Sequence, residues 1–543
     1  MAGAGRLSPL SPLSPLHVPS ILPPLRGALH RCGVSPASPG APRGAGADVL
    51  VVGAGFGGLG AALSLAERGA KVVLCEALRY PGGCASTFER GGYRFEAGAT
   101  LFSGLAPEQL FGRWIARHGL DVAVDWIDPL VELRTPSLRL PIGRDREALV
   151  AALAGLPGAP AAGVRAFFAY QARIADTLWA LFDDPALLPP LGAGALVRHA
   201  ASTPRYAALL PVLGRPLEGV LARFGVAGFA PLRHYLDGLC QITVQCGVAE
   251  AEAPFAMAAM DYYFRGTGHV RGGIGALAWA LVRAVERLGG EVRMATRVRS
   301  LEPGPEGFRA GTRSGEIRAR HVIANLLPQD LRALLGAAPG ALPRLDRLAR
   351  DVDEGGWGAA MLYLVARAPE GASPAAHHLE LVQDPGAPFI EGNHLFVSAS
   401  GAADEGRAPP GHRTITVSTH VPLAKLRALP PGRQGEYIGA IQARMREGLA
   451  ALAPEWSANV VHALTASPRT FARFTGRAGG AVGGVPRRAG LGHYLSVWPR
   501  PVQDGLWMVG DSVFPGQSTL AAAIGGARTA ESVARRLGRA GGC

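Results

Sequence analysis

The sequence predicts an α/β protein built around a parallel β-sheet, and two stretches near opposite ends of the chain predict it. In the first, "DVLVVGAGFGGLGAALSLAERGAKVVLCEA" (48–77), an apolar run leads into glycines, a helical pattern, a second apolar run and an acid. In the second, "GLWMVGDSVFPGQSTLAAAIGGARTAESVARRL" (505–537), an apolar run leads into a turn and a long helical pattern. A short apolar run followed by a helix is typical of strands buried in a parallel sheet.

The first stretch has the spacing of a Rossmann-type dinucleotide-binding unit. Val49–Val52 is an apolar, β-branched run, and Gly53, Gly55 and Gly58 follow it in the pattern GxGxxG. The first glycine allows a tight turn, the second lets a pyrophosphate approach the backbone, and the third lets the helix pack closely on the strand. Glu76 lies 23 residues after Gly53, where an acid accepts hydrogen bonds from ribose hydroxyls. An acid at this position favours a ribose without a 2′-phosphate, which leaves NAD or FAD.

Composition limits the classes of protein to consider. The chain has 543 residues, of which 48% are hydrophobic and 18% charged, so it can form large cores in two or three domains. Its apolar runs are shorter than the ~18–20 residues of a spanning helix, so we expect no transmembrane segment. The net charge is +13, but all except two of the 55 basic residues are scattered arginines, and Gly and Pro are abundant. This composition indicates a GC-rich coding bias, so we expect no nucleic-acid binding; contact with anionic lipid headgroups fits better.

The six cysteines predict neither a disulfide framework nor a metal site. None of them forms a CxxC pair, and Cys75 falls in a predicted buried strand. Cys240 and Cys246 are close in sequence but are interpreted as core thiols. The pattern fits a reducing compartment.

Residues 1–47 differ from the rest of the chain. They repeat Ser-Pro-Leu, contain four arginines and have no acid before Asp48. This composition predicts a disordered extension. It is either an organelle transit peptide or a dispensable extension of a bacterial protein, and the prolines favour the second because they interrupt any long amphipathic helix.

The middle of the chain predicts further strands and helices. The range 145–230 is mostly helical, and its helices are interpreted as a domain core, with the alternative that one apolar face dips into a bilayer. The glycines at 272–273 introduce a helix and a strand that end near 293. Further strands are predicted at 124–142 (several short ones), 297–302, 318–324 (leading to a loop), 357–366, 393–399 and 413–420, and a helix at 434–452.

The C-terminal stretch decides between the two cofactors. Leu506–Val509 reads as a buried strand, Gly510 and Asp511 end it, and Leu520–Leu537 reads as a helix after the loop Phe514–Ser518. A nicotinamide enzyme needs no second nucleotide contact so late in the chain. In flavoproteins, an acid such as Asp511 binds the ribityl or pyrophosphate region, and the helix N-terminus faces the flavin pyrimidine ring, where its partial positive charge stabilises a reduced flavin. The sequence therefore predicts FAD.

Four motifs give a resemblance to a known family. They are "YPGGCASTFERGGYRFEAGATLF" (80–102), "HVRGGIGALAWAL" (269–281), "SPRTFARFTGRAGGAVGG" (467–484) and "GDSVFPGQ" (510–517). Over most of 48–537 the chain resembles the phytoene desaturase and carotenoid isomerase family of FAD-dependent oxidoreductases. The last motif is more similar to the carotenoid isomerase version than to the desaturase version.

The resemblance implies further FAD contacts and a domain organisation. It adds Gly82, Gly83, Val298, whose backbone would contact adenine, and Gln517 to the FAD-binding residues Gly53, Gly55, Gly58, Glu76, Gly510 and Asp511. It implies a Rossmann-type FAD-binding domain with an interleaved substrate domain that combines a mixed β-sheet and a helical cap. The FAD-binding domain would comprise 48–120, 265–330 and 490–543, and the substrate domain 121–264 (the helical cap) and 331–489.

The implied activity is an FAD-dependent oxidoreductase that acts on an apolar polyene. The favoured reaction is cis-to-trans isomerisation of a carotenoid of the prolycopene type with reduced flavin. The alternatives are a phytoene-type desaturase that passes electrons to a quinone or oxygen, and a saturase of retinoid-like polyenes. A flavin amine oxidase and a non-catalytic FAD-binding protein are further alternatives, but the C-terminal aromatic cage and flavin-site lysine of amine oxidases find no match in "FPGQSTLAAA" or in Lys71 and Lys425.

No catalytic acid or base follows from the sequence. The flavin is expected to be the reactive centre, with the protein supplying position, electrostatics and exclusion of water. Arg271 and Arg477 are candidates by family position only. An enzyme without a spanning helix must still reach a substrate that dissolves in bilayers, so we expect a cytoplasmic protein attached peripherally to a membrane, or a plastid or other organellar protein if 1–47 is a transit peptide.

Overall fold

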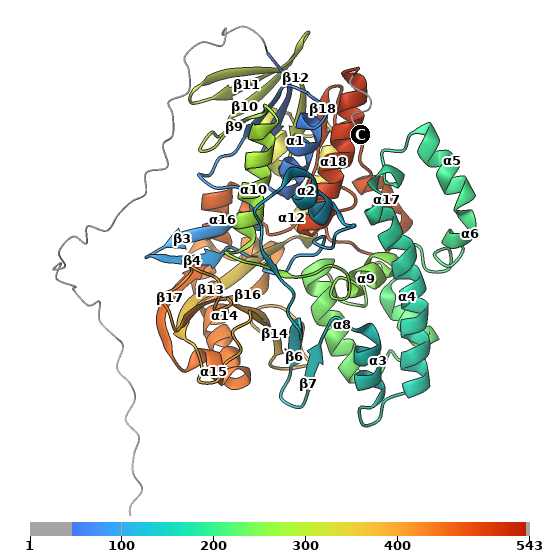
Figure 1. The fold of residues 1–543 in the computed structure, drawn as a ribbon, viewed down its shortest axis with the longest axis vertical. Helices are drawn as coiled ribbons and strands as arrows, with labels where there is room; N and C mark the ends of the chain where they lie inside the picture. The colour runs from blue at the N-terminus through green and yellow to red at the C-terminus, as the bar shows by residue number, and fades with distance from the viewer. Residues whose placement is uncertain (1–45, 99, 539–543) are drawn as a thin grey trace, which may run out of the picture. The chain divides into compact units, whose positions relative to one another are not determined.

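The computed structural model describes residues 46–98 and 100–538, and two seven-stranded sheets organise this part of the chain (Figure 1). The extension predicted at 1–47 lies outside the described residues except for its last two positions. The predicted α/β class with a Rossmann-type sheet is confirmed. Among the residues that the structure describes, no helix has both the length and the apolar character needed to cross a bilayer.

The first sheet unites the two stretches that predicted the fold. Strands β18, β12, β1, β2 and β9 run parallel in that order, and β10 and β11 extend the sheet in antiparallel fashion. Strand β12 is long enough to pair with β11 along its first half and with β18 along its last three residues. The bounds are β1 Ala47–Val52, β2 Val72–Cys75, β9 Glu291–Arg293, β10 Ser300–Gly304, β11 Gly307–Thr312, β12 Gly315–Ala324 and β18 Leu506–Met508.

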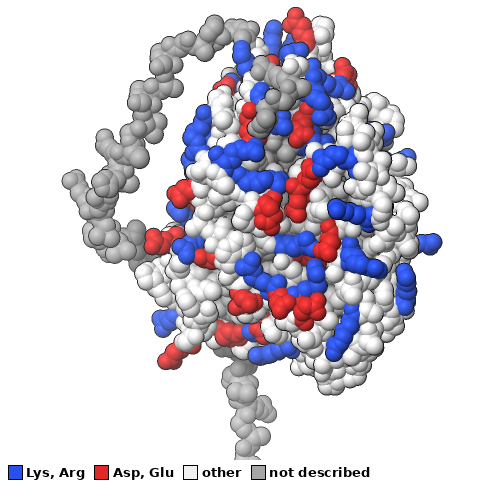
Figure 2. Space-filling model, turned by 45° about the vertical axis from the view of Figure 1, so that its right-hand side comes forward, with Lys and Arg blue, Asp and Glu red and all other residues white. Residues whose placement is uncertain are grey.

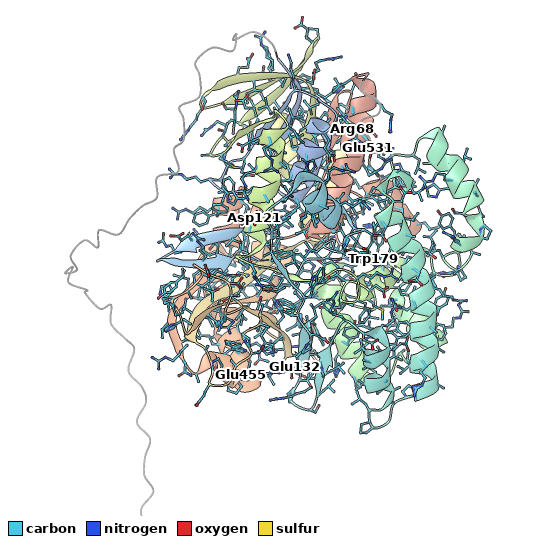
Figure 3. All side chains as sticks on the ribbon, in the orientation of Figure 1. Arg68, Asp121, Glu132, Trp179, Glu455 and Glu531 are labelled. Carbon is cyan, nitrogen blue, oxygen red and sulfur yellow. The ribbon has the colours of Figure 1, made fainter. Side chains whose placement is uncertain are left out.

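Helices α1 (Phe56–Ala66) and α10 (Ile274–Arg287) pack against this sheet, and α18 (Thr519–Arg536) packs along α1. Helices α1 and α18 touch backbone to backbone. A Cβ placed on Gly526 would lie 2.0 Å from the Gly57 carbonyl oxygen, and one on Gly60 would lie 2.4 Å from that of Ala523. Arg68 and Glu531 form an ion pair of 3.4 Å beside this contact (Figure 3). The two cofactor-related stretches are therefore locked together although more than 400 residues separate them.

The second sheet lies below the first in Figure 1 and is mixed. Its strands follow the order β17-β13-β16-β15-β14-β6-β7, and only β14 and β6 are parallel. Arg134 closes its lower end through ion pairs with Glu132 (2.9 Å) and Glu455 (2.6 Å), both labelled in Figure 3. The bounds are β6 Val131–Arg134, β7 Arg139–Ile142, β13 Trp357–Arg367, β14 His377–Val382, β15 His394–Ala399, β16 His412–Pro422 and β17 Val460–Ala466.

A group of helices occupies the right-hand side of Figure 1 and has its own core. Its centre contains buried aromatic and aliphatic side chains, among them Phe167, Tyr235 and Leu239. The helices are α3 Arg146–Ala154, α4 Ala161–Asp183, α5 Ala193–Ala201, α6 Thr203–Tyr206, α7 Leu217–Arg223, α8 Ala230–Thr243 and α9 Ala253–Met260, with a 3₁₀ turn at Pro185–Leu187.

Smaller elements complete the described chain. Strands β3 (Thr87–Arg90) and β4 (Tyr93–Glu96) form one hairpin, and β5 (Val124–Asp125) pairs with β8 (His269–Val270). The remaining helices are α2 Leu110–His118, α11 Pro328–Leu334, α12 Pro343–Gly355, α13 Leu423–Ala428, α14 Pro431–Leu452, α15 Pro454–Ser457, α16 Pro468–Thr475 and α17 Leu491–Val497, with a 3₁₀ turn at Ala478–Gly480.

The structure corrects two local predictions. The strand predicted at 297–302 begins only at Ser300, because the preceding backbone runs past Glu76 instead of pairing: the Thr296 amide donates to the Glu76 carbonyl oxygen. The loop predicted after β12 contains helix α11, which starts with Pro328 in its first turn, where the missing N–H costs nothing.

Candidate functional site

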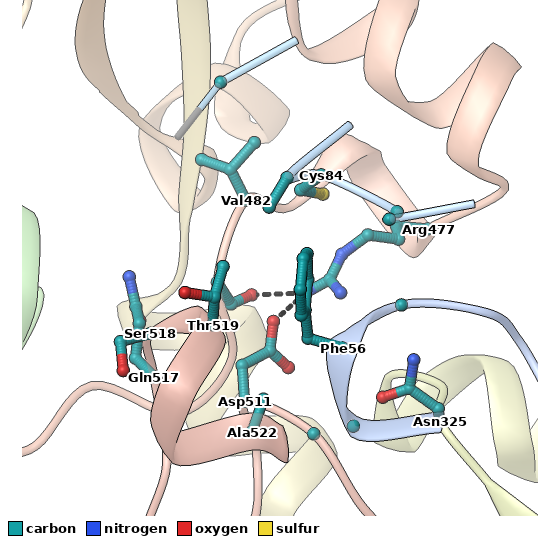
Figure 4. Close-up of a pocket in the computed structure, with 18 of the residues that line it drawn as sticks. Phe56, Cys84, Asn325, Arg477, Val482, Asp511, Gln517, Ser518, Thr519 and Ala522 are labelled. Atoms are coloured by element: carbon teal, nitrogen blue, oxygen red, sulfur yellow. Dashed lines mark hydrogen bonds and ion pairs between the residues drawn. The ribbon is translucent and has the colours of Figure 1, made fainter. Parts of the chain in front are cut away.

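A cavity of about 760 Å³ lies where the carboxyl ends of β1, β12 and β18 approach the second sheet. Figure 4 shows part of its lining. Nine of the ten residues predicted to bind FAD line it, namely Gly53, Gly55, Glu76, Gly82, Gly83, Val298, Gly510, Asp511 and Gln517. Gly58 lies one helical turn behind, where a Cβ would be 1.9 Å from the Gly53 carbonyl oxygen. Its role is therefore close packing within the turn rather than lining.

The turn after β1 leaves no room for side chains. Gly53 adopts a φ of +96°, in the left-handed region that favours glycine. A Cβ on Gly55 would lie 2.6 Å from Nδ2 of Asn325, the residue that follows β12. Gly510, after β18, meets the same side chain: its Cβ would lie 2.6 Å from Asn325 Oδ1. The Asn325 side chain thus lies between the two glycine turns and occupies the space where a Cβ at either turn would be placed.

Glu76 directly follows β2, and its carboxylate is turned back to the glycine turn. Oε2 accepts from the Ala54 amide at 2.7 Å and Oε1 from the Leu78 amide at 2.8 Å. The residue is only 7% exposed. Burial raises the pKa of this carboxyl, and the backbone hydrogen bonds and the charge of Arg297 oppose that rise. Each carboxylate oxygen keeps a free lone pair, so Glu76 can still accept bonds from ribose hydroxyls.

Asp511 and Arg477 form the polar centre of the cavity wall. Arg477 Nη2 contacts Asp511 Oδ2 at 2.7 Å and the Gly483 carbonyl oxygen at 2.6 Å, as the dashed lines in Figure 4 show. Burial lowers the pKa of this guanidinium, but the charge and hydrogen bond of Asp511, together with the charges of Cys84 and Asp330, outweigh burial and leave the pKa raised. The other candidate from the sequence, Arg271, is half exposed, pairs with Asp125 at 2.7 Å and does not line the cavity.

The N-terminus of α18 opens into the same cavity. Ser518 caps the helix: its Oγ accepts from the Ala521 amide at 3.1 Å, with a φ of +97° at Ser518. Gln517, Ser518, Thr519 and Ala522 line the wall beside it (Figure 4). The first N–H groups of a helix have no partner inside the helix, so this end carries a partial positive charge.

The other half of the cavity is mostly apolar. The three acids of the lining, Glu76, Asp330 and Asp511, belong to the half that contains the glycine turns. Neither Lys71 nor Lys425 lines the cavity, and Lys425 pairs with Glu391 at 2.7 Å. The apolar half is formed by Ile242, Val244, Phe255, Ala258, Ala259, Tyr262, Tyr263, Ala359, Met361 and Phe396.

One histidine, His420 in β16, lines the cavity together with the apolar residues of the second sheet. His420 follows Ser418 and Thr419 along β16, and its ring meets Trp357 edge-on with the centroids 5.8 Å apart. Burial lowers the pKa of His420 to about 3, so this side chain is neutral at physiological pH. This part of the lining therefore offers polar atoms without a charge.

Sequence reasoning missed several polar residues of the lining, among them Asn325, Gln245 and Arg487. Asn325 had a signal, because it is the first polar residue after a predicted apolar strand. Gln245 and Arg487 lie in irregular segments with no motif. Gln245 adopts a φ of +63° and donates from Nε2 to the Val482 carbonyl oxygen at 2.7 Å. Its Oε1 has no hydrogen-bond partner among the described residues.

The lining fits FAD on the structure's own terms. The turn at Gly53–Gly55 leaves bare backbone for a pyrophosphate, and Glu76 can receive a ribose. Buried polar atoms without a partner, Thr100 Oγ1 and Gln245 Oε1, await donors or acceptors at the cavity wall. Among the described residues, no cluster of three or more His, Cys, Asp or Glu could hold a metal ion.

Three comparisons with known proteins agree with this arrangement. The family model of flavin containing amine oxidoreductases matches residues 56–421. Chloroplastic prolycopene isomerase of Arabidopsis thaliana is 26% identical over 510 residues, which cover 90% of this chain and 83% of that protein. Hydroxyneurosporene desaturase of Cereibacter sphaeroides is 27% identical over 527 residues, which cover 89% and 97%. Cyclohexylamine oxidase from Brevibacterium oxydans shares the fold alone, with a TM-score of 0.56 and 16% identity over 91% of this chain and 100% of that one.

Proposed function

The chain belongs to the family of flavin-containing amine oxidoreductases, and we propose that it isomerises cis double bonds of an apolar, carotenoid-type polyene to trans. The resemblance to the carotenoid desaturase and isomerase group is confirmed, because a prolycopene isomerase and a hydroxyneurosporene desaturase each match about nine-tenths of the chain and a phytoene desaturase matches 51% of it. The protein is thus an FAD-dependent oxidoreductase of this group. Isomerisation as the reaction and a polyene as the substrate are what we propose for this chain.

The glycine-turn half of the cavity is proposed to hold FAD. Glu76 would accept hydrogen bonds from the adenosine ribose, with Val298 beside the adenine, and Gly53–Gly55 would leave backbone free for the pyrophosphate. Asp511 would accept from the ribityl chain while Arg477 holds its carboxylate in place. The remaining contacts proposed are Gly82, Gly83, Gly510 and Gln517. In its reduced form, bound FAD supplies electron density that can lower the bond order of a neighbouring double bond without net redox change.

The observation that carries the substrate proposal is the apolar half of the cavity. Aromatic and aliphatic side chains from α9 and the turn after it, such as Phe255, Ala259 and Tyr263, form its wall together with Met361 and Phe396. Such a lining removes a long hydrocarbon from water at a gain of roughly 25 cal/mol per Å² of buried apolar surface. It contains no carboxylate that could orient a cationic substrate. The protein's task there is to hold the polyene against the cofactor and to exclude water.

Isomerisation is favoured over desaturation by the C-terminal motif and by the isomerase relatives. "GDSVFPGQ" (510–517) builds the loop before α18, at the point where the cofactor half and the apolar half meet. Desaturation is the second candidate, since hydroxyneurosporene desaturase matches over 97% of its own length. It would remove two hydrogen atoms and need a quinone or oxygen as acceptor. Saturation of a retinoid-like polyene is the third, supported by human all-trans-retinol 13,14-reductase, 26% identical over 51% of this chain.

An amine oxidase activity is disfavoured by the lining. A protonated amine needs a polar or acidic partner, and the three acids that line the cavity all lie in the cofactor half. Both lysines of the chain lie outside the lining. Hydrogen peroxide released from simple amines and oxygen would support the oxidase reading, whereas its absence together with turnover of a polyene would exclude it.

The decisive experiment separates isomerisation from redox chemistry. The holoprotein is photoreduced without oxygen, and a poly-cis carotene in liposomes is added with no electron acceptor. We expect many turnovers to a trans product of unchanged mass. A product lighter by two hydrogen atoms, formed only by oxidised protein with an acceptor, would make the enzyme a desaturase, and a heavier one formed at the expense of reduced flavin would make it a saturase.

We also propose peripheral attachment to a membrane surface. Apolar side chains are exposed around α5, α6 and α17, among them Leu210, Leu491 and Leu495. A polyene partitions into bilayers, so an enzyme that docks on the bilayer meets its substrate at high local concentration. The compartment would be the cytoplasm, or a plastid, as for the chloroplastic relatives, if 1–47 acts as a transit peptide.

A further inference from the structure

Arg487 is a buried cation without a carboxylate partner. It is 2% exposed, and no carboxylate of the described residues lies within 4 Å of its guanidinium. Nη2 donates to the Val513 carbonyl oxygen at 3.1 Å, and Nε has no acceptor. Burial lowers the pKa of this guanidinium to about 10, which still leaves it charged at neutral pH. A buried charge without a counter-charge destabilises a folded protein, so its retention needs a reason.

The groups around Arg487 do not supply negative charge. His493 Nε2 lies 3.4 Å from Nη1, and burial together with the charges of Arg487 and Arg488 lowers the pKa of His493 to about 3, so that ring is neutral. The guanidinium carbon lies 5.7 Å from the centre of the Phe255 ring, a cation–π contact. The carboxylate whose charge acts most strongly on Arg487 is Asp511, and it already pairs with Arg477 at 2.7 Å.

The loop before α18 is shaped around this guanidinium. Gly516 adopts a φ of +116°, and a Cβ there would lie 2.1 Å from Arg487 Nη2. The same loop leads to Ser518 at the N-terminus of α18. Arg487 and this helix end both line the cavity, so two sources of positive charge face the same space. Gln245, with its unpartnered Oε1, lines the wall beside them.

We propose that Arg487 is the counter-charge for the flavin ring in its reduced state. The proposal rests on the FAD site described above, but not on the polyene chemistry. With the adenosine end held at Glu76 and the pyrophosphate at Gly55, the ring end of the cofactor would be held near α18 and Arg487. Reduction adds two electrons and one proton to the ring and leaves one negative charge on it. A fixed cation stabilises this charge relative to the neutral oxidised ring, because the site is preorganised and little water screens it.

The test measures the two-electron reduction potential of the bound FAD, without substrate, by titration with dithionite as electron donor. We expect Arg487→Gln to weaken the preference for reduced over oxidised FAD tenfold to a hundredfold, which lowers the potential by about 30 to 60 mV because a factor of ten corresponds to 29.6 mV for a two-electron couple. Arg487→Lys, which keeps the positive charge, should have a reduction potential close to that of the wild-type protein. Arg488→Gln is the matched control, since this neighbour is partly exposed, pairs with Glu250 at 3.0 Å and does not line the cavity.

A second readout covers variants that bind FAD weakly. Sulfite adds to the flavin ring and leaves a negative charge on it, so the sulfite Kd, followed as loss of the flavin absorbance in excess FAD, should rise tenfold or more in Arg487→Gln. An unchanged potential and sulfite Kd in Arg487→Gln would overturn the proposal, as would an equal shift in Arg488→Gln. If Arg487→Gln lowers the reduction potential as expected but the wild-type protein turns over no polyene, the role of Arg487 stands and only the proposed substrate is rejected.

Discussion

At Gly55 the space for a side chain is already occupied. A Cβ there would lie 2.6 Å from Asn325 Nδ2, and a larger side chain would also enter the space proposed for the pyrophosphate. We predict that Gly55→Val folds but loses FAD affinity at least tenfold, about 1.4 kcal/mol or more. The measurement is the ratio of flavin to protein absorbance after purification and the Kd of added FAD.

Gly219→Val is the matched control for that change. Gly219 lies on an exposed face of α7, and no atom would come within 4 Å of a Cβ there. It should keep full FAD content. Full occupancy in a folded Gly55→Val protein would argue decisively against the assignment of this turn.

His378 gives the stability of the fold a dependence on pH. The ring is buried in β14, neither of its nitrogens has a partner among the described residues, and burial together with the charges of His269, His377 and Arg407 holds its pKa well below the usual 6.5. The folded protein therefore keeps His378 neutral, whereas the unfolded chain takes up a proton below pH 6.5. The contribution of His378 to the free energy of unfolding is therefore complete above pH 6.5 and is lost as the pH falls below it.

The prediction for His378 compares two pH values. Lowering the pH from 7.5 to 5.5 should reduce the free energy of unfolding by about 1.4 kcal/mol through this histidine. The reason is that pH 5.5 lies one unit below the pKa of a histidine in the unfolded chain, so protonation stabilises the unfolded state. His378→Leu should remove that part of the loss, measured as the difference in urea unfolding free energy. His412, partly exposed at the start of β16, is the control position for a leucine substitution. An identical pH loss in wild type and His378→Leu would contradict the prediction.

The residues of the site were predictable where the chemistry is local. Gly53, Gly55 and Glu76 belong to one strand-turn-helix-strand unit, and Gly510 and Asp511 to another, so spacing alone indicated them. Their binding of FAD atom by atom remains a prediction. Arg487 could not be found, because its meaning depends on Gly516, Phe255 and His493 coming together in space and on the absence of a nearby acid.

At the scale of elements, the contact between α1 and α18 fixes how the two halves of the cofactor site meet. A Cβ on Gly526 would lie 2.0 Å from the Gly57 carbonyl oxygen, and backbone cannot move aside as a side chain can. We predict that Gly526→Ala destabilises the protein by about 2 kcal/mol or more and lowers FAD content, since α18 must shift away from α1. Thermal unfolding and flavin absorbance measure both effects.

A second alanine substitution in a helix serves as the control. Gly219→Ala in α7 adds a methyl group in open space and should stabilise the protein by about 0.5 to 1 kcal/mol, the ordinary helix preference of alanine over glycine. If Gly526→Ala were neutral or stabilising as well, the close contact between α1 and α18 would not limit the site.

The elements themselves were predictable unevenly. Strands β13, β15 and β16 were indicated by their apolar runs, and the helices at 145–230 by their period. Strand β14, "HHLELV", was missed because its two histidines hide an apolar pattern, and β17 because it is an edge strand with alternate residues exposed. No local pattern could show that α8 and α9 wall the cavity, because that depends on how the helical part packs against the second sheet.

At the scale of the whole described chain, the scattered basic side chains disfavour binding to nucleic acid, and the exposed leucines favour binding to a lipid surface. On the face that Figure 2 shows, basic side chains stand singly or in small groups between uncharged residues, with carboxylates among them. Leu210, Leu491 and Leu495 are 73%, 62% and 71% exposed. A Cβ on Gly214 would lie 3.0 Å from the Leu491 side chain, and the Gly490 amide donates to the Gly214 carbonyl oxygen at 3.0 Å. The segment before α7 and helix α17 are therefore neighbours and form one surface.

Helix α17 connects this surface to the cavity wall. On its inner face Tyr494 stacks on Phe255, which lines the cavity, with the ring centres 5.6 Å apart, and its hydroxyl bonds to Glu252. On its outer face Leu491 and Leu495 are exposed one turn apart. A bilayer that receives those leucines would lie one helix thickness from the proposed substrate site.

The last prediction tests that attachment with liposomes. The protein should float with vesicles that contain anionic lipid at low salt, and the double variant Leu491→Ser/Leu495→Ser should bind at least tenfold more weakly, because burying each leucine contributes about 1.5 kcal/mol or more. The matched control is Val460→Ser/Val461→Ser, which removes two exposed apolar side chains from the edge strand β17. It should float as wild type does. With detergent-solubilised substrate, the α17 variant should turn over polyene normally, since the leucines do not line the cavity; failure of the wild-type protein to float, or equal loss in both double variants, would reject α17 as the membrane contact.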